Sequence, residues 1–152
     1  FNLVFSLMHI YRHQFSEGIG LRQLIDYFYI LNGSNMSQRQ KAYTSICSLG
    51  MCKFAGAVMY VLKIVLNIDD SLLLCPTNPR YGKFLLDEIM IAGNFGQYDN
   101  RICHIEKQKR FKRGIAQFER NWKFAQYYPQ EVLWSPFWKL WHWGWRKCNG
   151  YL

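Results

Sequence analysis

Five ionisable side chains near the start of the chain have types and spacings that suit binding chemistry. They are His9, Arg12, His13, Arg22 and Asp26. Two histidines four residues apart share one face of a helix, but a metal site needs a third ligand, and none stands at a recognisable spacing. Arginine side chains bind phosphate through paired N–H donors, and an arginine four residues before an aspartate can also pair with it. The cluster therefore predicts no metal site and no catalytic residue, and leaves phosphate binding and structural pairing open.

A helical hairpin is needed to bring these side chains together. Apolar residues recur at three- and four-residue spacing on both sides of residues 16–20, which is the pattern of two amphipathic helices. Gly18 and Gly20 permit backbone angles that other residues avoid, so one helix can end and the next begin within this segment. The resulting polar corner can form one wall of a substrate site, or it can be a buried network that fixes the angle of the hairpin.

Apolar periodicity predicts further helices at about 37–48, 53–67, 80–92 and 101–127. The helix at about 53–67 is apolar on nearly every side, which predicts a central, buried position. Ser135 is expected to cap a last helix that begins at Pro136. No segment shows the apolar–polar alternation of a strand. We therefore predict an all-α fold, a compact bundle of about six or seven helices around the helix at 53–67.

The length of 152 residues, half of them apolar, suits one helical domain over residues 1–152. The chain begins at Phe1, already inside an apolar helix, so we interpret it as the carboxy-terminal portion of a longer protein. The longest apolar stretch, residues 54–68, is shorter than the roughly 20 residues that span a bilayer, and no membrane span is expected. Five scattered cysteines without a Cys-x-x-Cys pair favour reduced, mostly buried thiols in a cytoplasmic protein.

The positive charge is concentrated in the last third of the chain. Residues 1–100 contain eight basic and seven acidic residues, whereas residues 101–152 contain eleven and three. A basic patch lies within the helix expected at 101–127, and its members are Lys107, Lys109, Arg110, Lys112 and Arg113. Such a face can bind the phosphate backbone of a nucleic acid, dock on an acidic protein, or simply be solvated. No nucleic-acid motif accompanies it.

A row of tryptophans marks the last helix. Four of the six tryptophans fall at spacings of four, three and four residues, which places them on one helical face: Trp134, Trp138, Trp141 and Trp145. Indole rings are flat and apolar and carry one donor, so this face can stack on sugars, lie at a membrane interface or pack within a protein.

Several segments together resemble a large bacterial family of uncharacterised nucleotidyltransferases, often encoded near surface-polysaccharide genes. The resemblance begins at His9-x-x-Arg12-His13, continues through Gly18-Ile19-Gly20-Leu21-Arg22-Gln23 with Asp26-Tyr27, and recurs at Leu49-Gly50-Met51-x-Lys53-Phe54-Ala55, Gly93-Asn94-Phe95-Gly96 and Tyr128-Pro129-x-Glu131-Val132-Leu133-Trp134-x-Pro136. It covers nearly the whole chain. What it does not cover is the catalytic amino-terminal half of such proteins.

The resemblance implies transfer of a nucleoside monophosphate from a nucleoside triphosphate to an acceptor, with Mg²⁺ held by carboxylates. Such proteins carry a Gly-Ser turn followed about ten residues later by Asp-x-Asp, but no acidic residue lies between Ser34 and Asp69 in this chain. The adjacent pairs Asp69-Asp70 and Asp87-Glu88 diverge on a strand or helix. We therefore expect the catalytic residues and the Mg²⁺ site in a missing amino-terminal domain, and no activity from this chain alone. The competing hypothesis is a non-enzymatic basic module that binds nucleic acid or an acidic protein.

Overall fold

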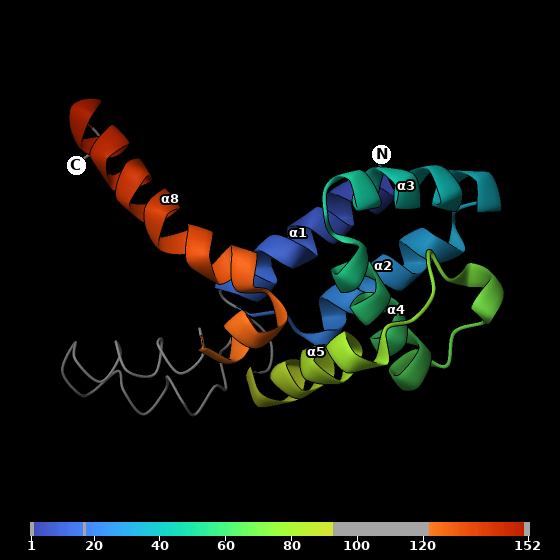
Figure 1. Cartoon of the computed structure of the whole chain (residues 1–152). Coiled ribbons are helices and arrows are strands. Elements are labelled where there is room, and N and C mark those ends of the chain that lie inside the picture. The colour runs from blue at the N-terminus through green and yellow to red at the C-terminus, as the bar shows by residue number, and fades with distance from the viewer. Residues whose placement is uncertain (1, 17, 93–121, 151–152) are drawn as a thin grey trace. The chain divides into compact units, whose positions relative to one another are not determined.

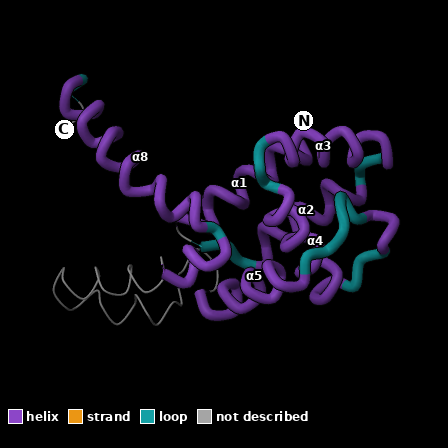
Figure 2. The backbone as a smooth tube through the Cα atoms, viewed as in Figure 1, coloured by secondary structure: helices purple, strands orange, loops and turns teal. Residues whose placement is uncertain are grey.

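Every regular element that the structure describes is helical, as predicted (Figures 1 and 2). This computed structural model describes residues 2–16, 18–92 and 122–150. The elements in chain order are α1 (Asn2–Ser16), α2 (Leu21–Asn32), α3 (Met36–Ser48), α4 (Cys52–Leu66), the 3₁₀ helix η1 (Asp70–Leu72), α5 (Pro79–Ala92) and α8 (Pro129–Cys148). The chain divides into two compact units, Phe1–Cys103 and His104–Leu152.

Helix α4 lies at the centre of the first unit, which confirms the prediction of a buried central helix at about 53–67. Eight of its residues are buried, in an almost unbroken run from Phe54 to Leu62. Helices α2, α3 and α5 pack against it, and the ring of Tyr11 on α1 meets the ring of Phe54 edge-on at 4.9 Å between centroids. A helix that is apolar on nearly every side can bury all of its faces only in such a position.

The predicted hairpin of α1 and α2 is confirmed. Gly18 has a φ of +89°, which non-glycine residues rarely adopt, and its N–H donates to the carbonyl of His13. The N–H of Gly20 donates to Oε1 of Gln23 at 2.9 Å, which begins α2. At the open end of the hairpin, the buried hydroxyl of Tyr27 donates to the carbonyl of Leu3 at 3.2 Å. These contacts fix how the two helices run side by side.

Side-chain caps start both α3 and α5. Asn35 accepts from the N–H of Gln38, while the side chain of Gln38 accepts from the N–H of Asn35, a reciprocal pair that starts α3. Asn78 accepts from the N–H of Tyr81 and so starts α5. Helix α5 therefore begins at Pro79, one residue before the predicted start.

The start of the last helix was predicted wrongly. Helix α8 begins at Pro129 and continues through Pro136 without a break. Proline is favoured at the first position of a helix, and both Pro129 and Pro136 suit that position. The helix starts at Pro129 because the preceding residue, Tyr128, has non-helical backbone angles, φ −131° and ψ 63°. Of the helix predicted at 101–127, residues 122–127 are helical and the remainder lies outside the described residues.

The expectation of uniformly reduced cysteines also requires correction. Cys47, at the end of α3, and Cys52, at the start of α4, form a disulfide with their Cα atoms 4.9 Å apart. Gly50, with a φ of +74°, turns the chain sharply between the two helices and brings the cysteines together. Cys75 is a buried free thiol, as expected, whereas Cys148 is free and exposed.

Candidate functional site

The three candidate site residues of α1 lie along one side of the helix. His9 and Arg12 are exposed and His13 is half-buried. The rings of His9 and His13 meet edge-on at 4.4 Å between centroids, and Phe5 stacks on the other side of His9. The spacing that suggested a shared face for the two histidines is therefore correct.

The two charged residues of α2 are both at the surface. Arg22 and Asp26 are exposed and lie one turn apart. Neither forms a hydrogen bond or ion pair with another described residue. The structure thus brings His9 and His13 into contact, and leaves the charged groups of α2 open to solvent in the part of the chain that it describes. The hypothesis of a buried network around Arg22 and Asp26 loses its support.

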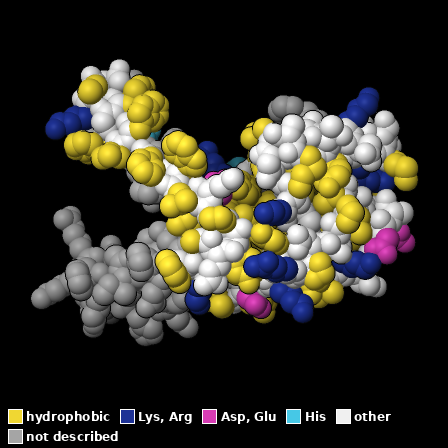
Figure 3. Space-filling view, in the orientation of Figure 1, with side chains coloured by type: hydrophobic (Ala, Val, Ile, Leu, Met, Phe, Trp, Pro, Cys, Tyr) yellow, Lys and Arg dark blue, Asp and Glu magenta, His cyan; other side chains and the backbone are white. Residues whose placement is uncertain are grey.

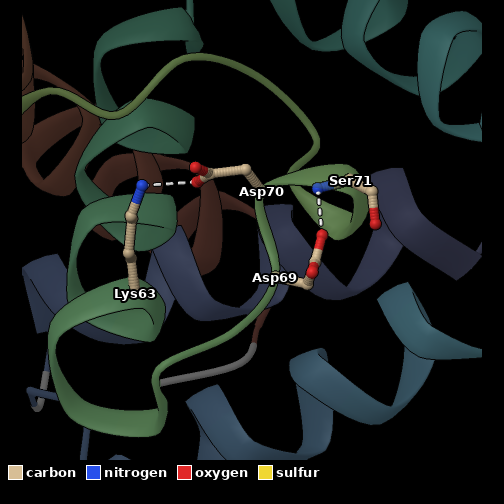
Figure 4. Close-up of polar contacts among 4 residues, drawn as sticks. All are labelled: Lys63, Asp69, Asp70 and Ser71. Carbon is tan, nitrogen blue, oxygen red and sulfur yellow. Dashed lines mark hydrogen bonds and ion pairs between the residues drawn. The ribbon is translucent and has the colours of Figure 1, made fainter.

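The acidic pairs do not converge on a metal ion. Asp69 accepts from the N–H of Ser71 at 2.7 Å, while Asp70 forms an ion pair with Lys63 on α4 (Figure 4). The hydrogen bonds from Ser71 lower the pKa of Asp69, and nearby Lys63 acts in the same direction. On α5, Asp87 is exposed and Glu88 is buried. Within residues 2–16, 18–92 and 122–150, no three His, Cys, Asp or Glu side chains gather to hold a metal.

A buried arginine that was not among the predicted site residues holds three segments together. The guanidinium of Arg39 on α3 donates to the carbonyl of Leu31 at the end of α2, to the carbonyl of Ser34 and to the carbonyl of Ser71 in η1. Arg39 is only 8% exposed. Its spacing offered a signal, because it shares one face of α3 with the buried residues Ala42 and Ile46. A charge on an apolar face needs buried partners.

A groove of about 640 Å³ lies between the start of α1, the end of α2 and one face of α3, and Ser34, which Arg39 contacts, is among its lining residues. It is lined partly by Leu3, Ile30, Gln38, Lys41 and Ser45. Its volume falls in the range of small-molecule sites, which is about 300–1,000 Å³. None of the five side chains predicted to form the polar corner lines it. The groove and the polar corner are therefore separate candidate sites.

The second unit presents a different kind of surface. Trp134, Trp141 and Trp145 of the predicted tryptophan face are exposed, as is Trp143. Figure 3 shows apolar side chains along α8. The basic patch at Lys107, Lys109, Arg110, Lys112 and Arg113 lies outside the described residues. None of the helices in the described ranges has the length and apolar character needed to cross a bilayer.

Comparison with known proteins returned no match to this chain, whether among protein-family models, curated proteins or solved structures.

Proposed function

We propose that this chain is the helical, substrate-side part of a nucleotidyltransferase-like protein, and that the polar corner contacts the phosphates of a nucleoside triphosphate. The observation that carries the proposal is that, within residues 9–31, the residues that form the turn and the core differ from the exposed charged residues. The turn uses Gly18, Gly20 and Gln23, and the core uses the apolar positions. Three charged residues of the resembling segment, Arg12, Arg22 and Asp26, are exposed on α1 and α2.

The chemistry of these exposed groups suits a triphosphate. Arg12 and Arg22 can each present several N–H donors to phosphate oxygens, and His9 adds a further donor. Asp26 stands one turn from Arg22 and can orient its guanidinium or repel a misplaced phosphate. The catalytic carboxylates and Mg²⁺ belong, on this proposal, to a domain outside the chain. Because nucleoside triphosphates are used inside cells, the proposal includes a cytoplasmic location.

Calorimetric titration of the 152-residue chain with MgATP, and separately with the other Mg-nucleotides, tests the proposal. Arg22→Ala is expected to weaken binding about tenfold, because a charge-assisted hydrogen bond contributes about 1.5–3 kcal/mol. Lys83→Ala is the matched control, since Lys83 is an exposed cation on α5. Lys41→Ala distinguishes the groove from the polar corner.

Three outcomes count against the proposal. The first is the absence of binding for every Mg-nucleotide. The second is binding that Lys41→Ala weakens and Arg22→Ala does not, which would assign the ligand to the groove. The third is strong, salt-dependent binding of RNA without a response to nucleotides, which would favour a basic nucleic-acid-binding module.

A further inference from the structure

Helix α8 exposes an unusual amount of apolar surface. Seven of its large apolar side chains are between 45% and 70% exposed: Leu133, Trp134, Phe137, Leu140, Trp141, Trp143 and Trp145. Large apolar patches on a protein surface mark sites where another molecule or a membrane binds. The question is which occupant this helix suits.

The exposed apolar residues lie on one wide side of the helix, where Lys147 also lies near the carboxy-terminal end. Leu133, Phe137 and Leu140 follow spacings of four and three, and so form one row along the helix; Trp134 and Trp141 belong to the adjacent row. At 100° per residue, His142 and Arg146 project from the opposite side, together with Glu131. Helix α8 is therefore amphipathic, with a wide aromatic side and a narrower polar side, which is the pattern of helices that lie in a membrane interface.

The charge of this region argues for an anionic occupant. Helix α8 carries Lys139, Arg146 and Lys147 against Glu131 alone, and residues 101–152 have eleven basic and three acidic residues. A second copy of the same surface would bring like charge against like charge, whereas an anionic lipid surface attracts it. The ammonium of Lys147 lies 5.2 Å from the ring centroid of Trp143, so positive charge is held directly beside an exposed indole.

We propose that α8 is an interfacial helix that lies flat on an anionic lipid surface. Its leucine, phenylalanine and tryptophan side chains enter the boundary between headgroups and acyl chains, where indole rings are favoured because they are apolar with one polar edge. Arg146, on the polar side, remains at the level of the anionic headgroups, and the long side chain of Lys147 lets its ammonium reach the same level. The helix is about 30 Å long, which gives it a long line of contact in the plane of the membrane.

Sedimentation of the 152-residue chain with lipid vesicles tests this proposal. We expect binding to vesicles that contain phosphatidylglycerol, a shift of tryptophan emission to shorter wavelength, and weaker binding to pure phosphatidylcholine or at high salt. The double variant Trp134→Ser/Trp141→Ser should lower the partition coefficient about tenfold or more. The double variant Arg146→Gln/Lys147→Gln should weaken binding to anionic vesicles about fivefold per residue and leave binding to phosphatidylcholine unchanged.

The matched control is Tyr29→Ser/Met36→Ser, which removes two exposed apolar side chains from the first unit. It should bind as the unaltered chain does. Circular dichroism should show unchanged helix content in every variant. The proposal is overturned if the chain binds neither kind of vesicle or if both α8 variants bind like the unaltered chain. It is also overturned if lipid-free chains self-associate through the two tryptophans and do not bind vesicles, because a second copy would then be the occupant.

Discussion

The guanidinium of Arg39 donates a hydrogen bond of 3.0 Å to the carbonyl of Ser71, thirty-two residues further along the chain. The same side chain donates to the carbonyl of Leu31, in the last turn of α2, and to the carbonyl of Ser34, just beyond the helix. One cation therefore ties α2, α3 and η1 together. Its charge also complements the negative end of the α2 dipole.

Replacement of Arg39 should destabilise the protein markedly. Arg39→Ala removes three hydrogen bonds from a buried side chain to backbone carbonyls, and we expect a loss of about 2–4 kcal/mol in the free energy of unfolding. Urea denaturation followed by circular dichroism measures this loss. Lys41→Ala, which removes an exposed cation from the same helix, should change the value by less than about 0.5 kcal/mol. Equal stability of the two variants would show that the hydrogen bonds of Arg39 contribute little.

The contact of α4 with α5 depends on the absence of a side chain at Gly82. A Cβ atom built there would lie within 2.5 Å of three atoms of Tyr60, including Cβ and Cγ, which cannot swing away because they are close to the backbone. Gly82→Ala should therefore lower stability by about 1–3 kcal/mol. Gly144→Ala is the matched control, because nothing lies within 4 Å of its added methyl group, and it should stabilise α8 by up to about 1 kcal/mol. The midpoint temperature of thermal unfolding is expected to fall for Gly82→Ala and to rise for Gly144→Ala.

The buried thiol of Cys75 should make stability fall in alkaline solution. Burial raises its pKa from the ordinary value of 9 to about 11. Between these values the thiol ionises in the unfolded chain and remains protonated in the folded one, so the unfolded state binds fewer protons and the free energy of unfolding falls as pH rises. We expect a loss of roughly 1 kcal/mol between pH 8 and pH 10 from this group.

Urea midpoints at pH 8, 9 and 10 measure the effect. Cys75→Ala should reduce the dependence on pH, whatever its effect on stability at pH 8. Cys148→Ala should leave the dependence unchanged, because Cys148 is exposed. Burial also raises the pKa of Tyr27, but in the unfolded chain tyrosine ionises around its ordinary value of 10, above that of the thiol, so Cys75 contributes most of the change between pH 8 and pH 10. Identical pH profiles for Cys75→Ala and the unaltered chain would contradict the prediction.

Local signals in the sequence were sufficient for much of the fold. Apolar periodicity placed the central helix at about 53–67, within one residue of α4, because hydrophobic spacing records which faces are buried. Gly18 marked the turn of the hairpin, and Asn78 marked the start of α5, because backbone angle and capping depend on neighbouring residues. Pro129 and Pro136 gave the same local signal, and only the backbone angles of the preceding residue distinguish them.

The candidate site was less predictable because its geometry depends on distant residues. The spacing of Arg22 and Asp26 allowed an ion pair but could not show that both would face solvent. Arg39 was missed because its partner Ser71 belongs to a separate segment. The disulfide was missed for a related reason. Cys47 and Cys52 do not have the Cys-x-x-Cys spacing, and they meet only because Gly50 turns the chain between two helices.

This disulfide should make the junction of α3 and α4 sensitive to reductant. The bond closes a short loop, and the entropy removed from the unfolded chain by such a closure corresponds to about 2 kcal/mol. We expect dithiothreitol to lower the urea midpoint of the oxidised chain, and thiol titration in denaturant to reveal two more thiols after reduction. The variant Cys47→Ser/Cys52→Ser should have the lower urea midpoint with and without dithiothreitol. The midpoint of Cys148→Ser should still fall when dithiothreitol is added. A midpoint that is the same with and without reductant, after the oxidised state has been verified by thiol titration, would mean that the disulfide does not stabilise this junction.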